Sequence, residues 1–258
     1  MPPRPHAVTF DCWSTLIVEA APGWGPSRRA RILAERADVD DARAGEAIGV
    51  AWREHQLRWH RGQAFTAHHM ALHALDLLGR ELDARALAEL TIALESEALN
   101  HEVRALPGAQ HALEALAEAG IRRALVCDTG FSPGRVVREL LVRAGLFDLL
   151  EAAVFSDELG VPKPSRRPFE EALAALGAPA ERAIHVGDLR RSDVAGARGM
   201  GMGSVRLALH HDDSDDQPGD RAGVIDCRVA GCTPPCPRPE ADVVARSYDD
   251  VLRALGLP

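Results

Sequence analysis

Lysine is almost absent from this sequence of 258 residues, because Lys163 is the only lysine among 30 basic residues. Such a bias toward arginine is typical of genome composition, so most of the arginines say little about function. A single retained lysine is more informative, because a guanidinium does not replace a compact ammonium on a flexible stem. We therefore treat Lys163 as a candidate functional residue.

Long apolar runs are absent as well. No stretch approaches the roughly 18 apolar residues of a membrane helix, and residues 1–12 hold no apolar segment of signal-peptide length. The net charge is −8 and the basic residues are scattered, whereas nucleic-acid binding needs a basic face. Five cysteines, an odd number, indicate a reducing compartment. We expect a cytoplasmic protein with a small-molecule substrate and no nucleic-acid or membrane partner, and the oligomeric state stays open.

Short apolar segments alternate with helical periodicity over much of the chain. The periodicity from the second segment onward predicts helices at Ala109–Ala119, Gly134–Ala144 and Pro168–Leu176. Alternating strands and helices predict an α/β fold, a Rossmann-like parallel sheet with helices on both faces. The apolar segments that predict buried strands are 7–12, 124–128, 152–156, 183–187 and 204–209.

Residues 18–102 interrupt this alternation. They contain no convincing strand, but helical stretches at Ala42–Arg61, Ala67–Leu78 and Ala84–Leu99. We interpret 18–102 as an all-helical cap inserted into a core made of 1–17 and 103–258. The Gly/Pro-rich segment 21–26 is a candidate hinge.

Four groups of polar side chains follow predicted strands. Open parallel sheets bind ligands at the carboxyl ends of their strands, so we expect these groups to meet. Along the chain they are Asp11, then Cys127, Asp128 and Thr129, then Lys163, and finally Asp188 with Asp193 five residues later.

In this order the four groups resemble the four motifs of the haloacid dehalogenase-like (HAD) hydrolase superfamily, and the helical insertion resembles its C1 cap. The resemblance implies a hydrolase in which Asp11 forms a covalent intermediate and Lys163 balances negative charge. It also implies Mg²⁺, held by Asp11, Asp188 and a backbone carbonyl near Trp13, with Asp193 as a supporting or alternative ligand.

The second motif would bind the substrate's phosphoryl oxygens. Cys127 aligns with the Ser or Thr of the family and is a weak donor, so Thr129 is a possible substitute, with Asp128 between them. Cys127 can equally be a buried apolar residue.

Trp13 departs from the phosphatase pattern. HAD phosphatases carry there a second Asp that acts as general acid and base, and indole cannot do this. L-2-haloacid dehalogenases also lack this Asp and have an aromatic residue, usually Tyr, at the position. They need no acid there, because halide leaves without a proton. They lack the acidic fourth motif that Asp188 represents, and their frequent Tyr six residues after the lysine is Phe169 here. Phosphonatases of this superfamily use a lysine in the cap. The predicted cap contains no lysine, so a phosphonatase is excluded.

Three hypotheses stay open. The first is a Mg²⁺-dependent phosphohydrolase of a small phosphorylated metabolite with a good leaving group, or with an acid taken from the cap. The second is a metal-independent 2-haloacid dehalogenase with a cap arginine on the substrate carboxylate. The third is a degenerate HAD fold that binds a ligand without turnover. The candidate acids are Glu19, His55, His60, His68 and His69, and the candidate arginines are Arg28, Arg29 and Arg31.

Three cysteines lie close together near the C-terminal end of the sequence. With His210 or His211, Cys227, Cys232 and Cys236 would make a zinc ligand set, but their spacing lacks the usual C-x2-C. Unpaired thiols in a loop are therefore the favoured interpretation.

Overall fold

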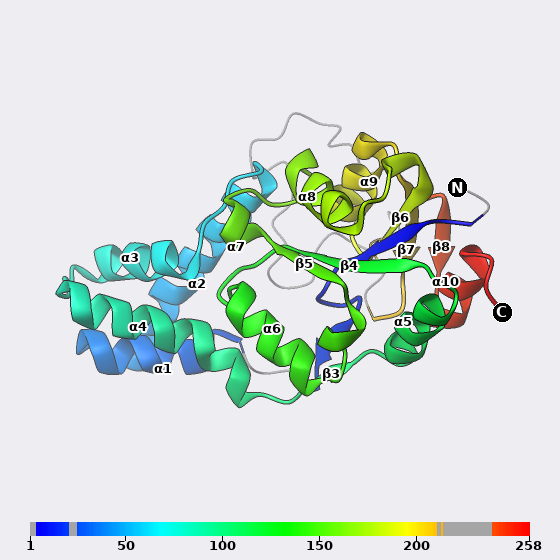
Figure 1. Cartoon of the computed structure of the whole chain (residues 1–258). Coiled ribbons are helices and arrows are strands. Elements are labelled where there is room, and N and C mark those ends of the chain that lie inside the picture. Colours follow the sequence, from blue (N-terminus) through cyan, green and yellow to red (C-terminus); the bar gives the residue numbers. More distant parts are fainter. Residues whose placement is uncertain (1–3, 21–24, 211–212, 214–238) are drawn as a thin grey trace.

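A six-stranded parallel sheet forms the centre of the computed structural model, which describes residues 4–20, 25–210, 213 and 239–258 (Figure 1). The strand order is β5-β4-β1-β6-β7-β8, so the predicted Rossmann-like α/β fold is confirmed. The strands are β1 (Ala7–Phe10), β4 (Arg122–Cys127), β5 (Ala152–Phe155), β6 (Ala183–Gly187), β7 (Gly203–Leu207) and β8 (Val243–Ala245).

Helices cover both faces of the sheet, because successive strand residues point to opposite sides. Val8 and Phe10 belong to one apolar cluster with residues of α5, α6 and α10, whereas Ala7 belongs to another with residues of α8 and α9. Every residue of β1 is buried, as expected for a central strand of a parallel sheet. The helices are α5 (Ala109–Glu118), α6 (Gly134–Arg143), α8 (Arg166–Leu176), α9 (Ala195–Met200) and α10 (Tyr248–Ala254).

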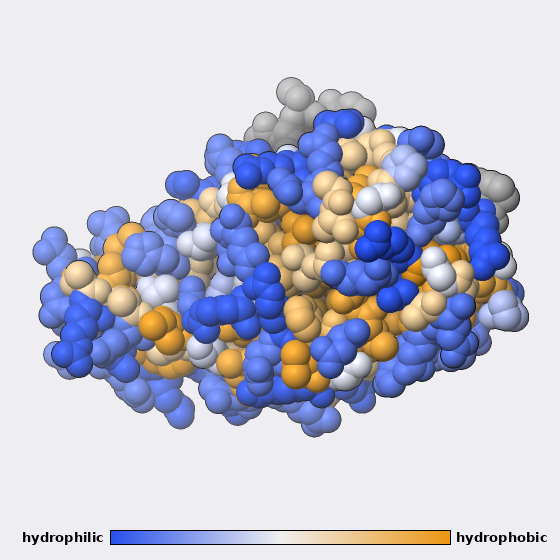
Figure 2. Space-filling model, viewed as in Figure 1, coloured by the Kyte–Doolittle hydropathy of each residue, from blue (hydrophilic) through white to orange (hydrophobic). Residues whose placement is uncertain are grey.

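Four further helices lie together beyond one end of the sheet (Figure 1). They share an apolar cluster of their own, and N-cap aspartates begin two of them, since Asp40 accepts from Arg43 N and Asp83 from Ala86 N, both at 2.8 Å. Hydrophilic residues cover most of this part on the face drawn in Figure 2. The helices are α1 (Gly25–Ala37), α2 (Asp41–His60), α3 (Ala67–Leu78) and α4 (Ala84–Ser96).

Two short strands connect these helices to the sheet region. β2 (Ile17–Glu19) pairs antiparallel with β3 (Val103–Ala105). The expectation of no strand within 18–102 is thus wrong at its first residues, because a three-residue strand that pairs with a distant segment leaves no local signal. The division into a cap of 18–102 and a core of 1–17 and 103–258 stays a prediction.

Several short elements complete the described chain. None of the described helices is long and apolar enough to cross a bilayer. Cys227, Cys232, Cys236 and His211 lie outside the described residues, so the zinc hypothesis stays untested. The short elements are η1 (Glu97–Asn100), η2 (Phe147–Leu149), α7 (Ser156–Leu159), η3 (Ala180–Arg182) and the π-helix η4 (Arg190–Val194).

A cluster of charged side chains lies at the base of the four helices. Arg29 of α1 is 2% exposed and donates to Leu94 O at 3.0 Å, and Glu97 of η1 is also 2% exposed. Glu19 of β2 has a buried carboxylate oxygen without a hydrogen-bond partner. Burial raises the pKa of Glu19 to about 8, with Glu97 adding to the rise and Arg29 opposing it.

A raised acid pKa destabilises the fold as pH rises, because the folded state holds the proton more tightly than the unfolded chain. The contribution of Glu19 is complete below its ordinary pKa of 4.5 and is lost as pH passes about 8. We therefore expect Glu19→Gln to raise the Tm by an amount that grows from pH 5 to pH 9, measured by circular dichroism. The exposed Glu118→Gln is the control, and an equal gain at every pH would contradict the argument.

Candidate active site

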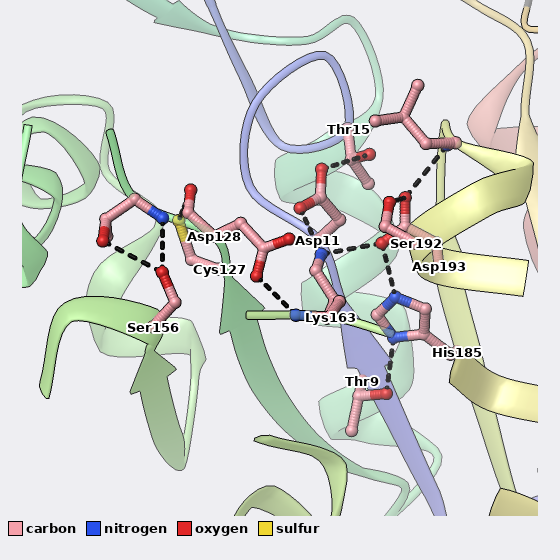
Figure 3. Close-up of polar contacts among 12 residues, drawn as sticks. Thr9, Asp11, Thr15, Cys127, Asp128, Ser156, Lys163, His185, Ser192 and Asp193 are labelled. Carbon is pink, nitrogen blue, oxygen red and sulfur yellow. Dashed lines mark hydrogen bonds and ion pairs between the residues drawn. The ribbon is translucent and has the colours of Figure 1, made fainter. Parts of the chain in front are cut away.

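Asp11 follows the central strand β1 and lies at the edge where the strands end (Figure 3). Its backbone N–H donates to Val186 O of β6 at 2.9 Å, which continues the sheet by one residue. The Thr15 hydroxyl donates to Asp11 Oδ2 at 3.2 Å. The only tyrosine, Tyr248 of α10, donates to the Thr15 carbonyl at 2.6 Å and so anchors this loop. Asp11 is therefore a fixed carboxylate.

Lys163 reaches the same place from the loop that follows α7. Its ammonium donates to Asp11 Oδ1 at 2.6 Å and to Asp193 Oδ1 at 2.7 Å, and the residue is 1% exposed. Burial alone would lower its pKa, but Asp11, Asp193 and Asp128 together raise the pKa of Lys163 well above its ordinary value. The only lysine of the chain is thus a buried, permanently charged bridge between two aspartates.

A buried histidine orients Asp193. His185 and Thr9 are register partners in β6 and β1, and His185 Nδ1 lies 2.8 Å from the Thr9 hydroxyl oxygen. His185 Nε2 lies 3.1 Å from Asp193 Oδ1, while Leu189 N donates to Asp193 Oδ2 at 2.9 Å. Although burial opposes ionisation, Lys163 and His185 hold the pKa of Asp193 well below its usual range. Asp193 is thus ionised and takes part in a network of hydrogen bonds.

Gly187 makes room for that carboxylate. A Cβ atom built on Gly187 would clash with the Asp193 carboxyl group. Since Gly187 ends β6, the close approach of Asp193 depends on a residue without a side chain at this point.

The acidic residues of the first and fourth motifs meet in space. Within the described part of the chain, Asp11, Asp188 and Asp193 form a group whose ligand atoms lie within 4.8 Å of one another. All three are buried, and carboxylate oxygens are the ligands that Mg²⁺ prefers. Burial raises the pKa of Asp11, Lys163 lowers it, and Asp193 and Asp188 add to the rise. Three carboxylates whose oxygens lie this close together offer the donor set that a divalent cation takes.

Trp13 lies in the turn after Asp11. It is half-buried, packs against the main core cluster and forms an isolated bridge with Ile17. The next residue, Ser14, has a φ of 61°, in the left-handed region that non-glycine residues seldom adopt. This tight turn holds the indole of Trp13 two residues after Asp11.

The second motif divides into a core residue and two residues with polar contacts. Cys127 belongs to the main apolar cluster together with Cys12, and burial next to Cys12 raises the pKa of its thiol. Asp128 Oδ1 accepts from the backbone N–H of Lys163 at 2.9 Å. Thr129 N donates to the Ser156 hydroxyl at 2.9 Å, and the two hydroxyl oxygens lie 3.0 Å apart. Asp128 and Thr129 therefore have polar contacts with neighbouring loops, and Cys127 is packed.

Among the residues proposed as substitute acids or as carboxylate ligands, only His55 lines the described cavity that also includes Thr129. His55 Nδ1 lies 2.7 Å from Phe65 O, which makes Nδ1 the donor, and His68 and His69 contact threonines of the helical part. Glu19 belongs to the charged cluster described above. Phe169 packs edge-on against His185 at 5.1 Å. The remaining residues are His60, edge-on to Trp59, the buried Arg29, and the exposed Arg28 and Arg31.

Four residues that contact side chains or backbone of the four motifs were not predicted from the sequence. Ser156 directly follows β5, so the strand-end rule that selected Asp11 could have found it. His185 and Thr15 lie in the segments of the fourth and first motifs, but the sequence alone assigned neither of them a role. Trp59 of α2 donates its indole N–H to Asp128 Oδ2 at 2.8 Å, and no sequence signal marks a side chain that reaches across from a separate helix.

The parallel α/β sheet with a buried lysine and three aspartates at its strand ends defines a hydrolase-type site. The family model of the haloacid dehalogenase-like hydrolases matches residues 5–201, and the chain belongs to this family.

A nucleotidase and a phosphatase are among the proteins to which the chain is similar. Pyrimidine 5′-nucleotidase YjjG of Escherichia coli K12 is 37% identical over 107 residues, 41% of this chain and 46% of the relative. Glyceraldehyde 3-phosphate phosphatase of Pyrococcus abyssi is 36% identical over 105 residues, 40% and 42% of the two chains. The chain thus matches less than half the length of each relative.

The solved structure of 2-haloacid dehalogenase from Pseudomonas syringae pv. tomato DC3000 has the same fold. It covers 98% of each chain with a TM-score of 0.62 and 23% identity.

Removal of the ammonium tests how the buried charges are balanced. We expect Lys163→Met to lower the free energy of unfolding by about 3–5 kcal/mol at pH 7.5, because two buried carboxylates lose their ion pair. Urea denaturation should show a smaller loss at pH 5, where protonation relieves the repulsion. The exposed Arg167→Met is the matched control. Equal stability of Lys163→Met and wild type at pH 7.5 would contradict this account of the site.

Proposed function

We propose that this protein is a Mg²⁺-dependent phosphohydrolase that forms a covalent aspartyl intermediate on Asp11 and acts on a small phosphorylated metabolite. The observation that carries the proposal is the contact of Lys163 with both Asp11 and Asp193, inside a group of three buried aspartates suited to a metal ion. The names of the matched phosphatases agree with this reaction class.

Asp11 has the environment of a nucleophile. One carboxylate oxygen accepts from the Lys163 ammonium and the other from the Thr15 hydroxyl, so the group is oriented. Attack forms a bond from an Asp11 oxygen to phosphorus and breaks the bond to the leaving oxygen, which departs with the electron pair. A water then attacks the same phosphorus, and Asp11 leaves as a carboxylate while inorganic phosphate is released.

Positive charge is the second requirement, because an anion attacks an anion. The ammonium of Lys163 supplies one charge beside Asp11. Asp11 and Asp188, with a backbone carbonyl near Trp13, would hold Mg²⁺, which supplies further charge when bound. Asp193 already accepts from Lys163 and Leu189, so we assign it to positioning the lysine.

Binding of the phosphoryl oxygens falls to the second motif. The hydroxyls of Thr129 and Ser156 contact each other next to Asp128, and each offers a rotatable hydrogen. We assign these two hydroxyl donors to contact with the substrate, whereas both carboxylate oxygens of Asp128 already accept hydrogen bonds from Lys163 N and from Trp59. The packed Cys127 has no such role in the proposal.

Trp13 restricts the leaving group. Because indole gives no proton to a departing alkoxide, the substrates that fit are esters whose leaving oxygen is stable as an anion.

Hydrolysis of p-nitrophenyl phosphate tests the proposal. Its leaving group needs little protonation, so Trp13 does not hide the activity. We expect turnover with Mg²⁺, loss of most of it with chelator, and a decrease of at least about 100-fold in Asp11→Asn, because the nucleophile is lost. Full activity of Asp11→Asn would sink the proposal.

Replacement of Trp13 tests the leaving-group restriction. We expect Trp13→Asp to raise the rate on an alkyl ester such as β-glycerophosphate about 10–100-fold relative to p-nitrophenyl phosphate, because the carboxyl supplies the missing acid. Trp13→Asn is the matched control, since its amide has nearly the same shape and transfers no proton. A similar change of the rate ratio in both variants would show that size at this position, and not acidity, matters.

A metal-independent 2-haloacid dehalogenase is the second candidate, and the aromatic residue at position 13 favours it. Among the three candidate arginines, Arg29 is buried, and its guanidinium carbon lies 4.8 Å from the Phe131 ring centroid in the loop after β4. Release of chloride from 2-chloropropionate that persists with chelator would support this candidate. If the protein releases neither halide nor phosphate, the result favours the third hypothesis, a protein that binds a ligand without turnover.

A further inference from the structure

Trp59 joins the helical part of the molecule to two loops of the candidate active site. It lies in the last turn of α2, and its indole N–H donates to Asp128 Oδ2 at 2.8 Å, in the loop after β4. The guanidinium of Arg191, in η4 after β6, lies 3.7 Å from the centroid of the Trp59 ring. One side chain of α2 thus contacts both loops.

Both loops are connected to the reacting groups. The other carboxylate oxygen of Asp128 accepts from the backbone N–H of Lys163, whose ammonium contacts Asp11 (Figure 3). Arg191 lies between Asp188 and Asp193 in the sequence, within the π-helical turn that delivers Asp193. Displacement of Trp59 would remove one side-chain contact from each of the two loops, at Asp128 and at Arg191.

We propose that Trp59 is a positioning residue that makes the geometry of the aspartate–lysine cluster depend on the docking of α2. This inference rests on the proposed function and adds to it the residue through which the cap acts. The hydrogen bond from indole to carboxylate is charge-assisted, and the ring face attracts the guanidinium. Both contacts exist only while α2 lies against the core.

A narrow cavity beside Thr129 agrees with this docked arrangement. The cavity between α2 and the strand ends has a volume of about 10 Å³, which is room for about one water molecule. Its wall includes Trp59, His55 and Phe65 on one side and Thr129 and Ser156 on the other. In the docked arrangement the space between Trp59 and Thr129 thus has no room for a substrate.

Trp52 provides a matched control on the same helix. Its ring stacks on His55 at 4.9 Å and on Phe131 at 5.7 Å, so its contacts are made by the ring faces. Phenylalanine preserves such stacking at both positions, but it removes the indole donor that Asp128 uses at position 59.

Kinetics with p-nitrophenyl phosphate and Mg²⁺ separate the two positions. We expect Trp59→Phe to lower kcat/KM about tenfold, mainly through kcat, because a charge-assisted hydrogen bond is lost. Trp52→Phe should stay within about twofold of wild type. In Asp128→Asn the amide cannot accept both N–H groups, so adding Trp59→Phe should cause little further loss. Additive effects, or equal losses in the two tryptophan variants, would overturn the inference.

Hydrogen exchange tests the same inference without turnover, and it decides the matter if the wild type does not hydrolyse the ester. We expect faster amide exchange at residues 128–130 and 190–193 in Trp59→Phe than in Trp52→Phe, measured in the full chain by mass spectrometry. Unchanged exchange in both loops would refute the positioning role, whatever the activity of the protein. Melting temperatures of the two variants show whether a general loss of stability accounts for the difference.

Discussion

The ammonium of Lys163 is held between the carboxylates of Asp11 and Asp193, and the arrangement of the site depends on these two ion pairs. Each of the three groups is expensive to bury alone, because a charge loses its hydration in the protein interior. Together they are tolerable, because the ammonium and the two carboxylates compensate one another's charge. The position of Asp11 therefore depends on this balance of buried charges.

The sheet brings these charges together at little further cost. Asp11 and Asp188 directly follow the neighbouring central strands β1 and β6, and Thr9 and His185 lie opposite each other in the same two strands. A hydrogen-bond chain thus runs from the interior of the sheet through His185 to Asp193. Strand pairing fixes the Thr9 end of this series of hydrogen bonds, and the ion pair with Lys163 fixes the Asp193 end. Asp193 is thus oriented from the core of the fold, whereas Lys163 reaches it from the loop after α7.

Much of this was predictable from the sequence. The central strands have apolar runs that few other structures allow, and α3 was expected with the bounds that the structure has, because its periodicity is strong and glycine follows it. Asp11, Asp188, Asp193 and Lys163 were found because strand ends converge. β2 and β3 were missed because three residues carry no period, and Trp59 was missed because its contact with Asp128 depends on how two parts of the chain dock. Local patterns determine elements, whereas contacts between distant elements need the assembled molecule.

The separation of the ion-paired residues along the chain has a consequence for synthesis. Asp11 and Lys163 are 152 residues apart, and β1 pairs only with β4 and β6. While the ribosome makes the intervening segment, the four helices after β2 can fold on local contacts, but the apolar strand β1 has no partner. β1 is thus made long before the strands that pair with it, and during that interval its exposed edges are open to association with other chains.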